Sequence, residues 1–259
     1  MSIAIELNEK VVLVTGALGS IASKTVARMI EAGAYLILTD IKTPEQASDD
    51  LRALDSVRGS WEYRKMDVLN EVEVSSVVRS IFARHPRIDT CIGLAGGCGM
   101  HPFASTSSEE FMKIFAFNFL GQTYFTRAVL VEWVERGTAG HLIYASSWVA
   151  TNPWPDLSAY VSAKAALDAF AKCIALEYAR YGIRVNSIAP GHVAGGSSLE
   201  VYNTDKQYRE AVDRVIPLGR MVRVEAVADA FAWLASGLAG DINGQVIRID
   251  LGASIPKLS

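Results

Sequence analysis

The sequence predicts an α/β protein built on a doubly wound parallel sheet of about seven strands, with helices on both faces. Short β-branched or aliphatic runs alternate along the chain with longer stretches of helical period, which is the pattern of consecutive βαβ units. A glycine-rich turn follows the first of these runs, at the edge where parallel sheets bind ligands. We expect the strands at residues 11–14, 35–39, 61–66, 89–94, 141–145, 184–189 and 245–249.

Two long helices between these strands begin after residues that can cap a helix N-terminus. Ser107, Ser108 and Glu110 precede an apolar helical run, and Asp156 and Ser158 precede a second one. Gly182 lies where the second helix should end, so we expect it to be the C′ residue of that helix.

The chain of 259 residues shows no composition break, repeat or linker, so we expect a single domain over residues 1–259. One long irregular stretch covers residues 191–219 and contains a plausible short helix near 199–214. Because this stretch follows the carboxyl end of the sixth strand, we expect a substrate lid there, with a mobile loop as the alternative.

Composition and charge are those of an ordinary soluble globular protein, with 50% hydrophobic residues, 20% charged residues and a net charge of -3. Lysine and arginine are scattered among acids, which disfavours a nucleic-acid partner. No segment approaches roughly 18 uninterrupted apolar residues, and no signal peptide is recognisable, so we expect neither membrane insertion nor secretion.

The cysteine and histidine pattern supports neither a disulfide framework nor a metal site. Cys91, Cys98 and Cys173 are odd in number and widely spaced, which indicates reduced thiols and a cytoplasmic location. We expect Cys98 to be an ordinary loop thiol. The histidines show no ligand spacing with one another or with cysteine, so no metal is expected.

The turn after the first strand has the features of a dinucleotide site in a Rossmann-type sheet. Small residues at Gly16, Gly19 and Ala22 allow a tight turn, a close approach of the pyrophosphate and close packing of the helix on the sheet. A plain strand-to-helix turn is the alternative for this motif alone. Asp40 ends the second strand, where a carboxylate can bind the adenosine ribose and repel a 2′-phosphate. We therefore expect NAD in preference to NADP, although Lys42 is a basic group nearby.

The segment after the fifth strand carries the strongest chemical signal. Tyr160 and Lys164 are four residues apart on a predicted helix and so share one face, and Ser147 lies 13 residues before the tyrosine. Hydride transfer to a carbonyl leaves an alkoxide that needs a proton. A tyrosine can supply that proton if an adjacent ammonium lowers its pKa from about 10.

From Lys10 to Ala253 the chain resembles the short-chain dehydrogenase/reductase family in its compact, single-domain form. Several motifs in the right order carry this resemblance. They are TGALGSIA at Thr15, Asp40, MDV at Met66, LAGG at Leu94, FNFLG at Phe117, SS at Ser146, YVSAK at Tyr160, RVNSIAPG at Arg184 and NGQVIRIDLGAS at Asn243.

The resemblance implies a role for each of four residues. Tyr160 would be the catalytic acid/base, while Lys164 would lower the tyrosine pKa and hold the nicotinamide ribose. Ser147 would polarise the substrate oxygen, a role for which Ser146 competes, although the spacing to the tyrosine favours Ser147. Asn118 would hold a water for a proton relay behind the lysine.

The resemblance also assigns the cofactor-binding residues. They come from the first turn, the ends of the second to fourth strands, the catalytic helix and the loop after the sixth strand. These residues are Gly16, Leu18, Gly19, Ser20, Ile21, Asp40, Ile41, Asp67, Val68, Ala95, Gly96, Tyr160, Lys164, Pro190, Gly191 and Val193.

The chain departs from the family pattern at four positions. Ser20 and Ala22 stand where compact members have glycine, while Gly19 comes one position early. Leu94 replaces the asparagine of the usual NAG motif, and Gly195 replaces a threonine that touches the carboxamide. These changes put individual cofactor contacts in doubt but leave the catalytic set intact.

Loops that should border the nicotinamide supply the candidate substrate pocket. Aromatic surface mixed with hydrogen-bond donors suits a cyclic or polyhydroxylated small molecule, although the tryptophans could instead only pack the loops over the core. The candidates are Met100, His101, Trp148, Asn152, Trp154 and His192.

Together these features predict an NAD-dependent oxidoreductase that transfers a hydride between a secondary alcohol and NAD. The alternatives are an NADH-using ketone reductase of the 3-oxoacyl type, an epimerase with tightly held NAD, and a non-catalytic NAD-sensing protein. The resemblance further implies a homotetramer or homodimer, paired through the long helices that carry Asn118 and Tyr160.

Overall fold

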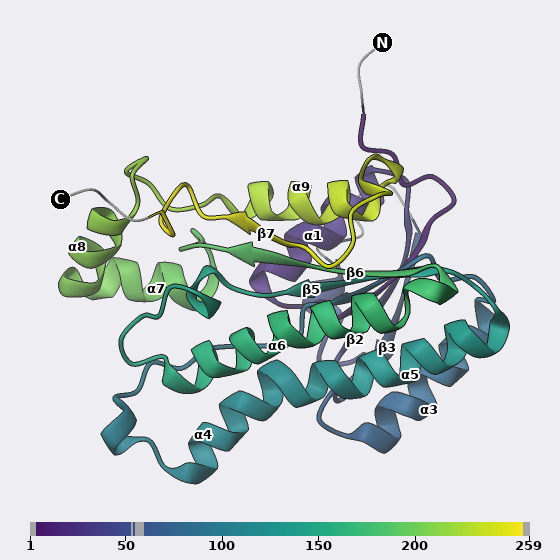
Figure 1. Ribbon diagram of the computed structural model, residues 1–259, viewed down its shortest axis with the longest axis horizontal. Coiled ribbons are helices and arrows are strands. Elements are labelled where there is room, and N and C mark those ends of the chain that lie inside the picture. Colours follow the sequence, from purple (N-terminus) through teal and green to yellow (C-terminus); the bar gives the residue numbers. More distant parts are fainter. Residues whose placement is uncertain (1–3, 53, 55–59, 256–259) are drawn as a thin grey trace.

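The computed structural model describes residues 4–52, 54 and 60–255. Its described residues form one parallel sheet of seven strands in the order β3-β2-β1-β4-β5-β6-β7 (Figure 1), which confirms the predicted architecture. The strands are β1 Val11–Thr15, β2 Tyr35–Asp40, β3 Ser60–Lys65, β4 Thr90–Gly93, β5 Gly140–Ala145, β6 Ile183–Pro190 and β7 Val246–Ile249.

Helices connect the strands and cover both faces of the sheet. The α-helices are α1 Ser20–Glu31, α2 Ser48–Arg52, α3 Glu71–Arg84, α4 Ser108–Phe115, α5 Gly121–Arg136, α6 Ser158–Glu177, α7 Gly196–Thr204, α8 Lys206–Val215 and α9 Val224–Ala235. A π-helical turn, η2 Ala116–Leu120, joins α4 to α5. The 3-10 turns are η1 Phe103–Ser105, η3 Trp148–Ala150, η4 Ala179–Tyr181 and η5 Gly237–Ala239.

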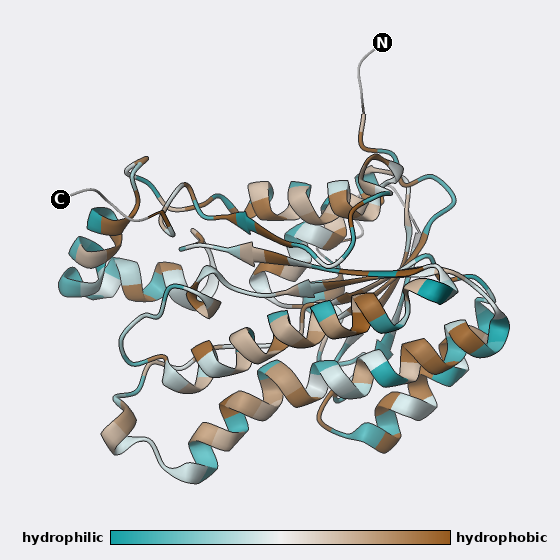
Figure 2. Cartoon of the chain, in the orientation of Figure 1, coloured by the Kyte–Doolittle hydropathy of each residue, from teal (hydrophilic) through white to brown (hydrophobic). Residues whose placement is uncertain are grey.

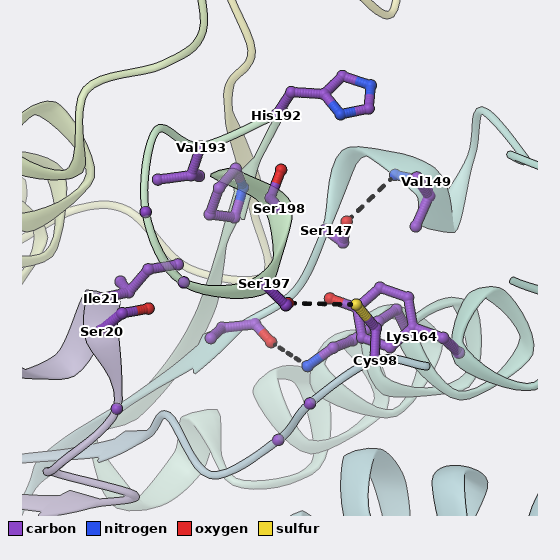
Figure 3. A pocket seen from close by; sticks show the side chains of 18 of the residues that line it. Ser20, Ile21, Cys98, Ser147, Val149, Lys164, His192, Val193, Ser197 and Ser198 are labelled. Carbon is purple, nitrogen blue, oxygen red and sulfur yellow. Dashed lines mark hydrogen bonds between the residues drawn. The ribbon is translucent and has the colours of Figure 1, made fainter. Parts of the chain in front are cut away.

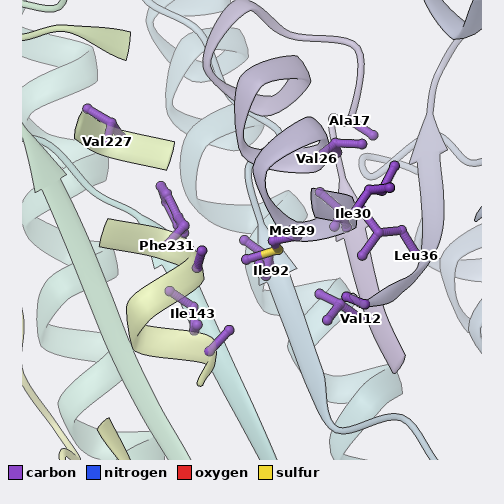
Figure 4. Packing of buried hydrophobic residues seen from close by; sticks show 14 of the residues in the cluster. Val12, Ala17, Val26, Met29, Ile30, Leu36, Ile92, Ile143, Val227 and Phe231 are labelled. Carbon is purple, nitrogen blue, oxygen red and sulfur yellow. The ribbon is translucent and has the colours of Figure 1, made fainter. Parts of the chain in front are cut away.

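The core forms two layers, one on each face of the sheet. On one face α1 and α9 pack through residues such as Met29 and Phe231 against Val12 and Ile143 of the sheet (Figure 4). On the other face α3, α5 and α6 form a second cluster that includes Trp133. Figure 2 shows the helices of both layers with apolar residues, whereas α8 at the edge of the molecule is mainly hydrophilic. None of the described helices is long and apolar enough to cross a membrane.

The strand order reverses direction between β1 and β4, which pair in parallel with Val12 opposite Thr90. The chain leaves β1 toward β2 on one side, and β4 leads to β5 on the other. The loops at the carboxyl ends of these two strands therefore diverge and leave a crevice, which is the usual ligand site of such sheets.

Of the three predicted helix ends, the first is confirmed and the other two are wrong. Ser107 caps α4, because its hydroxyl accepts a hydrogen bond from the Glu110 amide at 3.1 Å. Asp156 does not cap α6; it lies before the N-cap residue Leu157 with a positive φ of 63°. Gly182 has the expected left-handed conformation but ends the turn η4, because α6 already ends at Glu177.

The stretch 191–219 contains two helices, α7 and α8, where the sequence predicted one. Asp205 separates them, because its carboxylate accepts a hydrogen bond from the Tyr208 amide at 3.0 Å and starts a new helix. A parallel bridge between Val193 and Val222 joins the two ends of the stretch to each other. The pair of helices lies beyond the carboxyl ends of β5 and β6 (Figure 1).

Candidate active site

Two adjoining clefts open at the carboxyl edge of the sheet, with volumes of about 500 and 520 Å³. The first lies between the β1–α1 turn and the segments that follow β5 and β6, and the second continues toward the ends of β2 and β3. Gly16, Gly97 and Cys98 line both. In Figure 3 Ser20 and Ile21 border one side of the first cleft, and Ser147 and Lys164 border the other.

Tyr160 and Lys164 project from α6 into the first cleft beside Ser147, as their spacing predicts. The Lys164 ammonium lies 5.5 Å from the centroid of the Tyr160 ring and donates a hydrogen bond of 2.7 Å to the Ala145 carbonyl. Ser147 follows β5, and its hydroxyl hydrogen-bonds to Tyr160 and accepts from the Val149 amide at 3.4 Å. The end of β5 and one turn of α6 therefore bring these three side chains together.

The charges of this group differ from the sequence expectation in one respect. Burial raises the pKa of Tyr160, and the hydrogen bond from Ser147 only partly opposes this effect. Burial also lowers the pKa of Lys164 to about 8, against the attraction of Asp168. The expected lowering of the tyrosine pKa by the lysine is therefore not found: burial dominates, and the ammonium bonds to Ala145 and not to the phenol.

Asn118 is fully buried in the π-helical turn η2 and holds the loop that follows β4. Its amide donates to the carbonyls of Gly97 and Ile114, at 2.7 and 2.9 Å, and its oxygen accepts from the Gly97 amide at 3.2 Å. A Cβ on Gly96 would lie 2.7 Å from that oxygen and 3.4 Å from the Lys164 nitrogen. Asn118 and Lys164 therefore flank the same glycine. The wider spacing of a π-helical turn is common at functional sites.

The β1–α1 turn has the form of an anion site. Gly16 has a φ of 62°, and a Cβ there would lie 2.6 Å from the Ala95 backbone, so only glycine fits. The N-cap residue of α1 is Gly19, which offers no side-chain cap, and the first turn of the helix contains no acidic residue. Its first amides and the helix dipole therefore face the cleft, where they suit a pyrophosphate.

Asp40 occupies the position expected for a ribose ligand. It lines the second cleft, and its two oxygens accept hydrogen bonds from the Leu18 amide at 3.2 Å and the Ile41 amide at 2.8 Å. Lys42 forms an ion pair with Asp50 at 2.7 Å, so its charge is already partnered. The two clefts and these groups fit a dinucleotide.

Most of the remaining cofactor candidates line one of the two clefts. Leu18 does not line a cleft and contributes through its amide to Asp40. Asp67 lines the second cleft but also accepts a hydrogen bond from the Leu69 amide at 2.9 Å, which shapes its own loop. The candidates in the first cleft are Gly19, Ser20, Ile21, Gly96, Pro190, Gly191 and Val193, and those in the second are Ile41, Val68 and Ala95.

The structure explains two of the departures from the family pattern. Ala22 is 2% exposed and faces the interior, where a methyl group is accommodated. At Gly195 a Cβ would lie 2.7 Å from a methyl group of Val224, so the space for a threonine is already filled. Leu94 packs against the core beside α1. For Ser20 the structure gives no physical account beyond its place in the cleft.

Four of the six substrate candidates line the first cleft: Met100, Trp148, Trp154 and His192. His101 instead lines the second cleft, where its ring nitrogen lies 3.1 Å from Glu110. Asn152 lines neither cleft and donates to the Ser254 carbonyl at 3.3 Å. The structure therefore separates these two side chains from the other four, although they lie on the same loops.

Three aromatic rings surround His192 in the first cleft. Its ring centroid lies 5.1 Å from Trp148, 4.9 Å from Trp154 and 5.8 Å from Tyr208, whose hydroxyl lies 3.1 Å from its Nδ1 atom. Burial lowers the pKa of His192 to about 4, so the imidazole is neutral at neutral pH.

Sequence reasoning missed several cleft residues. Tyr208 comes from α8 and Ser197 and Ser198 from α7, and no local motif marks these positions. Cys98 is more than the ordinary loop thiol that the sequence suggests, because it lines both clefts, 4.0 Å from the Ser197 hydroxyl. Among the described residues no group of three or more His, Cys, Asp or Glu could hold a metal ion.

A sheet of this order, with a phosphate-binding turn and a tyrosine, lysine and serine in one cleft, defines a dinucleotide-dependent oxidoreductase. Comparison with known proteins agrees with this class. A family model described as "Enoyl-(Acyl carrier protein) reductase" matches residues 16–254.

Three similar proteins match over nearly their full length. The 3beta-hydroxysteroid dehydrogenase 1 of Eggerthella lenta is 29% identical, over 96% of this chain and 95% of its own. The glucose 1-dehydrogenase of Gluconobacter oxydans is 30% identical, over 95% and 92%. A short-chain type dehydrogenase/reductase from Mycobacterium ulcerans, 26% identical, superimposes with a TM-score of 0.90 over 97% of this chain and 92% of its own.

The chain therefore belongs to the short-chain dehydrogenase/reductase family. It is an oxidoreductase of CH–OH groups, and its family uses a nicotinamide cofactor.

Proposed function

We propose that this protein transfers a hydride between a secondary alcohol of cyclic or sugar-like type and NAD, with Tyr160 as the acid/base. The convergence of Tyr160, Ser147 and Lys164 in one cleft beside the phosphate-binding turn supports this proposal most strongly. Bound NAD supplies the hydride acceptor for alcohol oxidation, and NADH the hydride donor for the reverse reaction.

Each side chain has a distinct task in this proposal. Tyr160 takes the hydroxyl proton of the alcohol through its phenol oxygen, and Ser147 donates a hydrogen bond to the same substrate oxygen. Lys164 holds a positive charge beside the phenol and stabilises its anionic form. Asn118 fixes the Gly97 backbone next to the lysine and would hold the water of a proton relay behind it.

The proposed preference for NAD rests on Asp40. Its carboxylate lines the second cleft and would accept hydrogen bonds from the ribose hydroxyls, while it would repel a 2′-phosphate. The pairing of Lys42 with Asp50 supports the same preference, because the nearby cation is already compensated.

The proposed substrate class rests on the lining of the first cleft. Trp148 and Trp154 offer flat apolar surfaces, and Ser147 and Tyr160 offer polar atoms at one end. Two of the relatives are named for alcohols on rings, a 3β-hydroxysteroid and glucose, which supports a cyclic substrate.

A second candidate direction has an observation in its favour. Because burial raises the pKa of Tyr160, the phenol carries its proton at neutral pH and can donate it to a ketone. An NADH-using ketone reductase is therefore the alternative, with the same residues in the same positions.

We further propose that the chain acts as one domain and that residues 191–219 form a lid over a small-molecule substrate. We also propose that the protein is a homo-oligomer and that it works in the cytoplasm. The aromatic contacts between His192 and Tyr208 support the lid, since they join α8 to the loop after β6. All three cysteines are free, which supports a reducing compartment.

Tyr160→Phe tests the proposed mechanism. We expect kcat to fall by about 10³ because the acid/base group is lost, with NAD affinity within about twofold of wild type. Tyr181→Phe, beyond the far end of α6, is the control and should keep wild-type kcat. Persistent turnover in Tyr160→Phe would contradict the mechanism.

A further inference from the structure

A buried carboxyl group lies behind the catalytic lysine and takes no part in the chemistry described above. Tyr160, Lys164 and Asp168 follow one another at intervals of four residues along α6, so their side chains share one face of the helix. Lys164 is 3% exposed and Asp168 is 8% exposed. Lys164 is the only lysine or arginine that is buried in the described part of the chain.

Two hydroxyl groups of the sheet face this carboxyl group. Ser146 follows β5 directly, and Ser187 lies in β6, the strand on which α6 packs. Both hydroxyls approach the Asp168 carboxylate closely enough to stabilise its negative charge. The contacts are not well-formed hydrogen bonds, however: the Oδ1 atom of Asp168 and both hydroxyl oxygens are buried without a hydrogen-bond partner. The fold thus buries a carboxylate that is not fully hydrogen-bonded by its polar neighbours.

Such an arrangement is costly for stability, because a carboxylate loses its hydration on burial. An asparagine would fill the same space at a lower desolvation cost. The negative charge of Asp168 can have a function because it lies next to Lys164. A buried lysine favours its neutral amine form unless an anion lies nearby.

We propose that Asp168 is a positioning residue that keeps Lys164 in its ammonium form beside Tyr160, with Ser146 and Ser187 holding the carboxylate in its ionised state. The titratable groups that face Lys164 are Tyr160 and Asp168 on α6 and the thiol of Cys98 in the loop after β4. Those that face Asp168 are Lys164 and the exposed Lys172, both on α6.

The electrostatics of the two groups agree with this arrangement. Burial lowers the pKa of Lys164 to about 8, and the carboxylate of Asp168 is the largest influence that opposes this fall. Burial raises the pKa of Asp168 above its usual value, and the two serines, Lys164 and Lys172 oppose this rise only in part. Removal of the carboxylate should therefore lower the pKa of Lys164 further, so that the lysine loses its proton at a lower pH.

The test compares Asp168→Asn with wild type in the pH dependence of kcat/KM for alcohol oxidation. We expect the alkaline limb of the profile to move to lower pH by about one unit. Asp168→Glu keeps the charge and should restore the limb. Lys172→Gln removes an exposed charge one turn further along α6 and should leave the limb in place. Cys98→Ser measures what the thiol contributes to the position of the alkaline limb.

A second measurement does not depend on turnover, whereas the kinetic test rests on the proposed function. NMR titration of protein with ¹³C-labelled lysine, with the Lys164 signal identified by its loss in Lys164→Arg, gives the pKa of the lysine directly. Asp168→Asn should lower that value by about one unit. Ser146→Ala should lower it by less, and it serves in place of Asp168→Asn if the latter does not fold.

The outcomes separate this proposal from the proposed function. Unchanged lysine titration in both Asp168→Asn and Ser146→Ala would overturn the role of Asp168, even if thermal stability changed. A wild-type protein that oxidises no alcohol, but whose Lys164 titration moves as expected, would contradict the proposed function and leave the Asp168 inference supported.

Discussion

The nucleotide end and the substrate end of the cleft are built in different ways. At the nucleotide end, short turns bring backbone amides and a few small residues to fixed positions, as at Gly16 and Gly19. At the substrate end, side chains from distant segments meet, as Trp148 and Trp154 do with Tyr208 of α8. In the proposed function, the first end would bind the cofactor and the second would select the substrate.

The two ends should also differ in how well they tolerate substitution. A backbone turn such as the one at Gly16 tolerates little change, because a Cβ would strike the Ala95 backbone. The aromatic cluster instead depends on side chains in α8 and in the loops after β5 and β6, which can change without disturbing the sheet. The effects of substitutions at the two ends should therefore differ in kind as well as in size.

The largest effect is expected from Gly16→Ala at the nucleotide end. The new Cβ would lie 2.6 Å from the Ala95 backbone at a φ of 62°, so the turn must move. We expect NAD affinity to fall at least about tenfold and the free energy of unfolding to fall by about 2 to 3 kcal/mol. Isothermal titration and urea unfolding measure the two effects.

Gly219→Ala is the matched control for that substitution. Gly219 has a φ of 64°, but beyond its chain neighbours no described atom lies within 4 Å of the place that a Cβ would take, so only backbone strain is introduced. We expect a loss of about 1 kcal/mol and unchanged NAD affinity. Equal losses of NAD affinity in the two variants would show that close approach to Ala95 does not shape the turn.

Asp40→Ser should change the choice of cofactor more than the rate. Loss of the carboxylate removes the repulsion of a 2′-phosphate and the acceptor for the ribose hydroxyls. We expect the ratio of kcat/KM for NADP to that for NAD to rise about tenfold. Asp67→Asn, two residues after β3, is the control and should leave the ratio within about twofold. A ratio that stays constant in Asp40→Ser would remove Asp40 from cofactor selection.

Trp154→Ala should affect substrates selectively. The side chain lines the first cleft and packs 4.9 Å from His192, so its loss removes apolar surface next to a bound ring. We expect KM for cyclohexanol to rise about five- to tenfold and KM for 2-propanol to change by less than about twofold. Equal small changes for both alcohols would place Trp154 outside the substrate pocket.

The smallest effect at neutral pH is expected from His192→Gln, which should alter the acid part of the stability curve. The pKa of His192 is about 4 in the folded protein and about 6.5 when unfolded. The unfolded chain therefore binds more protons between these values, and the free energy of unfolding falls as pH drops from about 6.5 to 4.

His192→Gln should make that fall shallower, as urea unfolding at a series of pH values can measure. The buried His141 also has a lowered pKa and remains in the variant, so part of the acid dependence should persist. An identical slope in the variant and in wild type would show that His192 is not buried in its neutral form.

Most of the fold and the centre of the site could be predicted from the sequence, because local patterns determine them. The strands follow from short apolar runs, and Tyr160 and Lys164 follow from one helical turn. Asp40 is predictable because it ends a strand next to the switch point. Asn118 can be found only by resemblance, since an asparagine within an apolar helix shows no local sign of the π-helical turn.

Other features depend on contacts between distant segments, which a single sequence does not display. Tyr208 reaches the cleft only because Asp205 starts a second helix in the 191–219 stretch. The space beside Gly195 is filled by Val224, 29 positions further along the chain. The raised pKa of Tyr160 comes from burial, and the sequence indicated only the neighbouring ammonium.

In the proposed function the hydride moves directly between the alcohol carbon and NAD, while Tyr160 exchanges the proton and Ser147 and Lys164 support it. The most direct test follows NADH absorbance when purified protein is mixed with NAD and a panel of cyclic alcohols, sugars, polyols and hydroxysteroids. We predict NADH formation with at least one ring alcohol, and much less with NADP in place of NAD. The proposed function would be contradicted if the protein bound NAD tightly but formed no NADH with any member of the panel and oxidised no NADH with the matching ketones.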